Sequence, residues 1–190
     1  MRSLPIAAFA TACALAWPLA AGAANPQVEL KTSLGSMTIE LYADKAPKTV
    51  ANFLEYVKSG HYAGTIFHRV IPGFMIPGGG YAKDLYQKPT RPPLQHEGAA
   101  CAGNDTGTIA MARTGDPHSA TSQFFINVVN NDKLNYTLPP QGWGYCAFGK
   151  VVKGMDVAQK IVAVPTGASG PHQNLPKDAI LIESVTLVAK

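Results

Sequence analysis

The residue whose chemistry stands out most in this sequence is an arginine in apolar surroundings. Arg69 lies within residues 67–80, FHRVIPGFMIPGGG, where most neighbouring side chains are apolar. In a strand, successive side chains face opposite ways, so Arg69 would share a face with Phe67 and Ile71. Burying a guanidinium without a partner is costly, so either its charged end reaches water beside a packed stem or a ligand uses it. Taken alone, Arg69 is best interpreted as structural.

A second segment, residues 123–127, combines aromatic and amide side chains. Period-two geometry puts Phe124 and Ile126 on one face, and Gln123, Phe125 and Asn127 on the other. The first face predicts core packing. The second joins a large ring to amides that donate and accept hydrogen bonds, which suits a binding surface. An ordinary half-exposed strand with Phe125 covered by a loop remains the alternative.

Length and composition indicate one compact domain. The chain has 190 residues, of which 46% are hydrophobic and 15% charged, enough to bury a sizeable core. The formal net charge is +4, but the basic residues are scattered along the chain. We therefore predict no nucleic-acid partner.

The first 23 residues have the pattern of a cleavable signal peptide. Arg2 supplies the positive end, residues 6–19 the apolar run, and Ala21-Gly22-Ala23 the small-residue cleavage site. Cleavage after Ala23 would leave residues 24–190 as a single exported domain. The apolar run is short and no second one follows, so we expect no membrane anchor.

Two cysteines, Cys101 and Cys146, remain after the signal is removed, and in an oxidising compartment they either form one disulfide or stay as buried thiols. The sequence leaves both possibilities open. No histidine lies at ligand spacing from either cysteine, and the five histidines are scattered, so we predict no metal site.

Hydrophobic periodicity predicts mostly strands. Residues 28–41 read as a hairpin, and a helix follows with Asp44 as the candidate cap, Pro47 in the first turn and Gly60 at the end. Similar patterns predict strands at 107–111, 145–152 and 180–188, a second helix at 154–162, and loops over 81–106, 129–143 and 165–176. This order favours an antiparallel barrel or sandwich capped by helices.

Four segments together resemble one family. The segments are, in order, FHRVIPGFMIPGGG, GTIAMARTG, SQFFINV and FGKVVKGMDV. Together they are similar to the cyclophilin-type peptidyl-prolyl cis-trans isomerases, particularly the periplasmic members from Gram-negative bacteria. The resemblance runs from about Val28 to the C-terminus. It implies a closed eight-stranded antiparallel barrel with a helix over each end, and a binding groove outside the barrel, where Arg69 would avoid the core.

The resemblance also implies a reaction. The partial double bond of an X-Pro amide gives a rotation barrier of about 18 to 20 kcal/mol. At the twisted transition state electron density returns to the prolyl nitrogen, so a donor aimed there binds the transition state better than either planar state. Arg69 would be that catalytic donor, because arginine stays protonated. The reaction needs no cofactor, and proline-containing polypeptides would be the partners.

Further residues take roles only through the resemblance. The positions that line the proline pocket in the family are occupied by Phe74, Met75, Phe125 and Leu134, with Tyr145 also in the groove. Gln123 and the backbone around Ala112 and Arg113 would hydrogen-bond the substrate's peptide groups.

The sequence departs from the family pattern at several places. Pro77 stands where many members carry Gln, and Arg113 where Asn is common. Lys133 replaces the Trp of cyclosporin-sensitive relatives, and Tyr145 replaces their His. The loop between Leu134 and Phe148 is also longer than in the eukaryotic cytosolic members, and together with Lys133 and Tyr145 it predicts weak cyclosporin binding. We also expect a monomer.

Three functions are weighed. The first is an isomerase acting on exported proteins during folding. The second is a proline-groove binding module or holdase chaperone whose turnover is reduced because Pro77 replaces Gln. The third, a serine hydrolase using Ser119 or Ser122 with His118, lacks a nucleophile-elbow motif.

Overall fold

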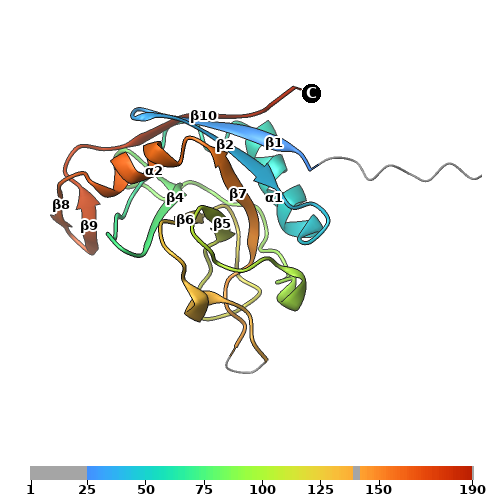
Figure 1. Ribbon diagram of the computed structural model, residues 1–190. Coiled ribbons are helices and arrows are strands. Elements are labelled where there is room, and N and C mark those ends of the chain that lie inside the picture. Colours follow the sequence, from blue (N-terminus) through green and yellow to red (C-terminus); the bar gives the residue numbers. More distant parts are fainter. Residues whose placement is uncertain (1–24, 139–141, 190) are drawn as a thin grey trace, which may run out of the picture.

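Eight antiparallel strands close into a barrel (Figure 1). The computed structural model describes residues 25–138 and 142–189. Around the barrel the strands are β1 (Gln27–Thr32), β10 (Leu181–Leu187), β3 (Thr65–Phe67), β4 (Met75–Ala82), β6 (Phe124–Asn127), β5 (Thr108–Met111), β7 (Ala147–Lys153) and β2 (Gly35–Leu41). The prediction of a mainly β, closed eight-stranded antiparallel barrel with two helices is confirmed.

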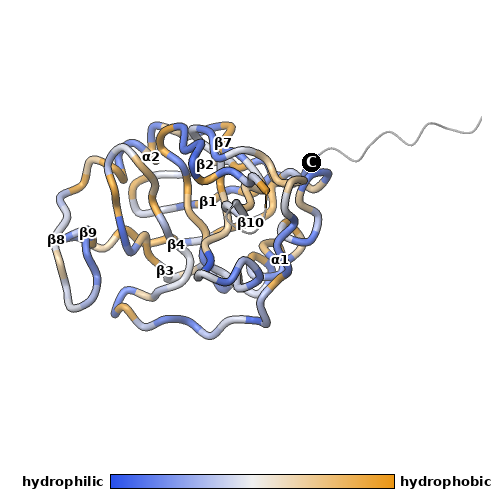
Figure 2. Tube along the Cα trace, turned by 90° about the horizontal axis from the view of Figure 1, so that it is seen from below, coloured by the Kyte–Doolittle hydropathy of each residue, from blue (hydrophilic) through white to orange (hydrophobic). Residues whose placement is uncertain are grey.

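The interior of the barrel is built by alternation along the strands. In the β1–β2 hairpin, Leu30 lies opposite Met37 and Val28 opposite Ile39, and all four side chains are fully buried. The polar residues between them point outward. Figure 2 shows apolar stretches along the barrel strands, whereas β9 is mostly hydrophilic.

Two helices lie at opposite ends of the barrel (Figure 1). Helix α1 (Pro47–Lys58) buries one stripe that includes Val50, Phe53 and Val57. Helix α2 (Met155–Val162) buries Val157, Ala158 and Ile161. Both agree with the spacing of apolar residues in the sequence. Two short 3-10 turns, η1 (Gly98–Ala100) and η2 (Asp132–Leu134), lie in the connecting loops.

The predicted cap of α1 was wrong. Asp44 does not cap the helix; Ala46 occupies the N-cap position and makes no side-chain cap hydrogen bond. The carboxylate of Glu97 does this instead, accepting from the backbone N–H of Lys48 at 3.0 Å and of Thr49 at 2.9 Å. The Glu97 carboxylate, from a distant loop, thus accepts hydrogen bonds from the free N–H groups, and its negative charge stabilises the positive end of the helix dipole.

Residues 165–176, predicted as loop, form a hairpin. β8 (Thr166–Ser169) pairs with β9 (His172–Pro176), and the hairpin extends away from the barrel (Figure 1). Most of its side chains are exposed, so it lacks the apolar alternation from which a strand is predicted. Backbone pairing and the turn at Gly170, whose φ is +54°, define it instead.

The strand predicted through Arg69 ends earlier. β3 stops at Phe67, which is fully buried, whereas Arg69 is exposed, so the two do not share a face. The backbone has left the ladder here, since the N–H of Val70 donates to the carbonyl of Asn174 in β9 at 2.8 Å.

The predicted signal peptide, residues 1–23, lies outside the described residues. Among residues 25–138 and 142–189, none of the helices has the length and apolar character needed to span a membrane. The cleavage site near Ala23 stays a prediction.

Candidate functional site

A small apolar cluster lies on the outer face of the barrel, separate from the main core. In β6, Phe124 and Ile126 join the main core, as their alternation predicted, and Phe125 points the other way. Phe125 is nevertheless only 1% exposed. What we call the outer cluster consists of Phe125, Ala110 and Ala147, packed against the partly buried Met75, Ala102, Ala112, Leu134 and Tyr145. Its partly exposed members give the barrel an apolar outer surface.

Four strands and three connecting segments bring the outer cluster together. Met75 comes from β4 and Phe125 from the neighbouring β6, while Leu134 is the last residue of η2 and Tyr145 lies just before β7. The N–H of Tyr145 donates to the carbonyl of Leu134 at 2.8 Å, which fixes these two side chains beside each other. Five of the residues assigned through the resemblance therefore lie in one place: Met75, Ala112, Phe125, Leu134 and Tyr145.

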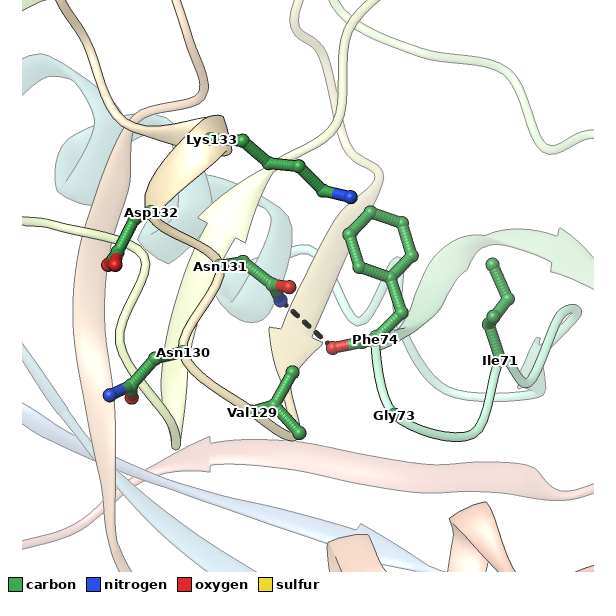
Figure 3. Close-up of a pocket in the computed structure, with 8 residues that line it drawn as sticks. All are labelled: Ile71, Gly73, Phe74, Val129, Asn130, Asn131, Asp132 and Lys133. Atoms are coloured by element: carbon green, nitrogen blue, oxygen red, sulfur yellow. Dashed lines mark hydrogen bonds between the residues drawn. The ribbon is translucent and has the colours of Figure 1, made fainter.

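Phe74 lies outside the outer cluster and lines a neighbouring hollow of about 440 Å³ (Figure 3). The ammonium nitrogen of Lys133 is 5.4 Å from the centroid of its ring. The side-chain amide of Asn131 donates to the Phe74 carbonyl at 2.9 Å, as the dashed line in Figure 3 marks. Phe74 thus stands at the edge of the apolar surface, with a cation over one face of its ring.

Gln123 and Arg113 line a second hollow, of about 380 Å³, next to Ala112. Gly80 lies directly behind Gln123, and a Cβ atom at that position would collide with the glutamine side chain. The last glycine of the run in residues 78–80 therefore makes room for Gln123.

The side chain of Arg113 is fixed rather than free. Its Nε donates to the carbonyl of Gly144 at 2.8 Å, and Nη1 donates to the carbonyl of Thr114 at 2.8 Å. The guanidinium lies 4.7 Å from the ring centroid of Tyr145, and that ring meets Phe125 edge-on at 5.5 Å. Arg113 thereby holds the wall of the outer cluster in place.

Arg69 lies one strand away from the outer cluster. Phe67, the last residue of β3, stands opposite Gly78 of β4, and the residue before Gly78, Pro77, stands opposite Phe125. None of the ion pairs formed within residues 25–138 and 142–189 involves Arg69.

A disulfide and an amide network, neither fixed by sequence reasoning, support the site. Cys101 is bonded to Cys146, which decides between the two alternatives left open above. The side-chain amide of Asn104 donates to the carbonyls of Leu134 at 3.0 Å and Tyr145 at 3.1 Å. The fully buried amide of Asn127 donates in turn to Asn104 at 3.2 Å. No local pattern pointed to Asn104, because these partners lie 23 or more residues away.

The serine hydrolase geometry does not form. The Oγ of Ser119 donates to the carbonyl of Asp116, and Nδ1 of His118 accepts from the N–H of His96 at 3.1 Å. Within the described part of the chain, Ser122 Oγ is buried without a hydrogen-bond partner. The same part contains no group of three or more His, Cys, Asp or Glu residues placed to hold a metal ion.

Comparison with known proteins decides the family. Residues 27–187 match the family model of the cyclophilin type peptidyl-prolyl cis-trans isomerase/CLD. The chain belongs to this family. It is 55% identical over 161 residues to peptidyl-prolyl cis-trans isomerase B of Escherichia coli (strain K12), covering 84% of this chain and 98% of the relative. Isomerase cyp18 of Streptomyces antibioticus is also 55% identical, over 162 residues, covering 85% of this chain and 98% of the relative.

The cyclophilin fold is also found among solved structures. A cyclophilin type isomerase of Cryptosporidium parvum, crystallised in the presence of the dipeptide Ala-Pro, has a TM-score of 0.71 and 26% sequence identity. The similarity covers 86% of this chain and 99% of that one. This chain is accordingly an enzyme of the peptidyl-prolyl cis-trans isomerase class, cyclophilin type.

Proposed function

We propose that this isomerase acts on X-Pro bonds of exported polypeptides during their folding. The proline ring packs on the outer cluster, and Arg69 donates to the prolyl nitrogen as the bond twists. The observation that carries the proposal is that Phe125 points away from the main core yet is almost fully buried, with the exposed Arg69 one strand away.

The catalysis follows from the difference between planar and twisted amides. A planar amide delocalises the lone pair of its nitrogen, and a twisted one returns that pair to the nitrogen. A guanidinium aimed at the nitrogen therefore stabilises the transition state selectively. The outer cluster holds the ring still by apolar contact, while Gln123 and the backbone at Ala112 and Arg113 hold the preceding peptide groups. No proton has to be removed at any step.

Three observations support an exported, proline-containing client. The Ala-Pro dipeptide used with the Cryptosporidium parvum relative is the minimal X-Pro unit. The Cys101–Cys146 disulfide suits an oxidising compartment such as the periplasm, because cytosolic thiols are kept reduced. The signal-like segment that ends at Ala23 leads to the same compartment.

The test is the turnover of Arg69→Ala on an uncharged Ala-Ala-Pro-Phe peptide, followed by NMR exchange spectroscopy. We expect kcat/KM to fall by roughly 10² to 10³, the range for removing a preorganised donor. Arg91→Ala is the matched control, because Arg91 is an exposed arginine whose side chain pairs with Glu55 at the surface. Equal rates for wild type, Arg69→Ala and Arg91→Ala would refute the role of Arg69, and no turnover by wild type would refute the activity.

We also propose that cyclosporin binds weakly and that the chain is a monomer. Lys133 presents an ammonium over Phe74, where a flat apolar side chain would be needed to pack on a cyclic peptide. Calorimetry with cyclosporin tests the first statement, and a nanomolar dissociation constant would refute it. Light scattering during gel filtration tests the second.

A further inference from the structure

The β8–β9 hairpin forms a second wall beside Arg69. Together with residues 68 and 69 it encloses a hollow of about 270 Å³, lined by His68, Arg69, Pro171, His172 and Gln173. We call it the hairpin hollow. It is distinct from the outer cluster, because the two share no residue.

Specific contacts hold the hairpin in this position. The N–H of Val70, next to Arg69, donates to the carbonyl of Asn174 at 2.8 Å. The ring of Tyr81 packs against both histidines, with its centroid 4.7 Å from that of His68 and 5.4 Å from that of His172. The hairpin is therefore anchored by a backbone bond on one side and by aromatic packing on the other.

The hairpin hollow is lined by one guanidinium, two imidazoles and one amide, and by no carboxylate. None of the ion pairs among the described residues involves Arg69 or His172. Nδ1 of His68 is buried and has no hydrogen-bond partner within the same part of the chain. Burial, followed by electrostatic interaction with His172 and Arg69, lowers the pKa of His68 to about 4. A site with this lining favours an anion.

We propose that the hairpin hollow is a subsite for an acidic side chain of the client polypeptide, next to the proline. The inference rests on the proposed function, since Arg69 is shared between the two sites. A guanidinium has five N–H donors, so one edge can hold a carboxylate while another N–H points at the prolyl nitrogen. His172 and Gln173 supply the remaining donors. Inorganic phosphate has the same chemistry and is the competing occupant.

The experiment measures kcat/KM for peptides in which one residue, up to two positions before or after the proline, is either Glu or Gln. For wild type we expect one position at which the Glu peptide is preferred roughly three- to tenfold, the scale of a charge-assisted hydrogen bond at a partly exposed site. The preference should shrink at high salt, because exposed charges are screened.

His172→Phe is the decisive variant, since it keeps an aromatic ring against Tyr81 but loses the ring N–H. We expect the Glu-to-Gln ratio to fall to about one. Lys177→Ala is the control: it removes an exposed cation just after the same hairpin but outside the hollow, and should keep the wild-type ratio.

The outcomes separate the two proposals. A wild-type ratio near one at all positions, with normal turnover, would overturn the subsite and leave the isomerase function standing. Turnover no faster than that of Arg69→Ala on every peptide would overturn the function itself. Inorganic phosphate is the last probe. If it inhibits the isomerisation of the Glu and Gln peptides equally and perturbs the NMR signals of His172, the hollow binds free anions and the assignment to a client side chain fails.

Discussion

Pro77 stands directly opposite Phe125 in the register of β4 and β6. The N–H of Val128 donates to the carbonyl of Phe74, so Met75 and Asn127 form a pair without hydrogen bonds to each other. Hydrogen-bonded and non-hydrogen-bonded pairs alternate along antiparallel strands, so Pro77 and Phe125, two residues further along, also form a non-hydrogen-bonded pair. The missing N–H of Pro77 therefore costs no bond between these strands. Its side chain lies on the same face as that of Phe125 and presents an apolar ring where a glutamine would present an amide.

Pro77→Gln is accordingly expected to raise the turnover. A glutamine amide there would orient Arg69 and bond the substrate, and we expect kcat/KM to increase roughly three- to tenfold, the effect of about one hydrogen bond. The free energy of unfolding should fall by about 0.4 to 1 kcal/mol, because proline restricts the unfolded chain. Peptide exchange kinetics and urea denaturation measure the two effects. An equal increase in Pro77→Ala would show that removal of the ring, not the amide, is responsible.

The Cys101–Cys146 bond should contribute about 2 to 4 kcal/mol to the free energy of unfolding. It joins residues 45 apart in the sequence, and a crosslink of that span removes conformational entropy from the unfolded chain. Denaturation with and without dithiothreitol measures the contribution. A Cys101→Ser/Cys146→Ser variant should match the reduced protein and be indifferent to the reductant; a reductant effect in that variant would contradict this explanation.

Glu97→Ala should destabilise the protein by about 1 to 2 kcal/mol. The variant leaves two backbone N–H groups and the hydroxyl of Thr49 without their acceptor at the start of α1. Glu55→Ala, on the exposed face of the same helix, is the control and should cost less than about 0.5 kcal/mol. Thermal denaturation compares the two, and a Glu97 variant as stable as the Glu55 variant would refute the capping role.

Acid should weaken the fold partly through His68. Its pKa in the folded protein, about 4, lies below the unfolded value of 6.5, so the unfolded chain takes up the proton first. The stability contributed by neutral His68 is complete above pH 6.5 and is lost as the pH falls toward 4. After allowing for the exposed part of the ring we expect a loss of roughly 2 kcal/mol.

The His68→Gln variant isolates this contribution. Burial also lowers the pKa of His61 and His96, so the wild-type curve contains similar contributions from those two rings. The difference between the variant and wild type, measured by urea denaturation from pH 7 to pH 4.5, reports on His68 alone. Parallel curves would show that the protonation of His68 is not linked to unfolding.

Local patterns predicted the parts of the fold that local physics decides. Alternation separated Phe124 and Ile126 from Phe125, and helical spacing located α1 and α2, because burial imposes these periods directly. Glu97 caps a helix 48 residues earlier in the chain, and no local pattern records that contact. The β8–β9 hairpin has hardly any buried side chains, so its strands carry no apolar alternation. The early end of β3 depends on a backbone bond to that same unpredicted hairpin.

The closure of the barrel also determines when the fold can be completed. β1 pairs with β2 on one side and with β10 on the other, so that Val28 stands between Ile39 and Leu187. During synthesis from the N-terminus, β1 and β3 keep open edges until residues 181–187 have left the ribosome, and open edges are sites of aggregation. Completion of this barrel therefore waits for nearly the whole chain, and its N-terminal strand needs protection longest.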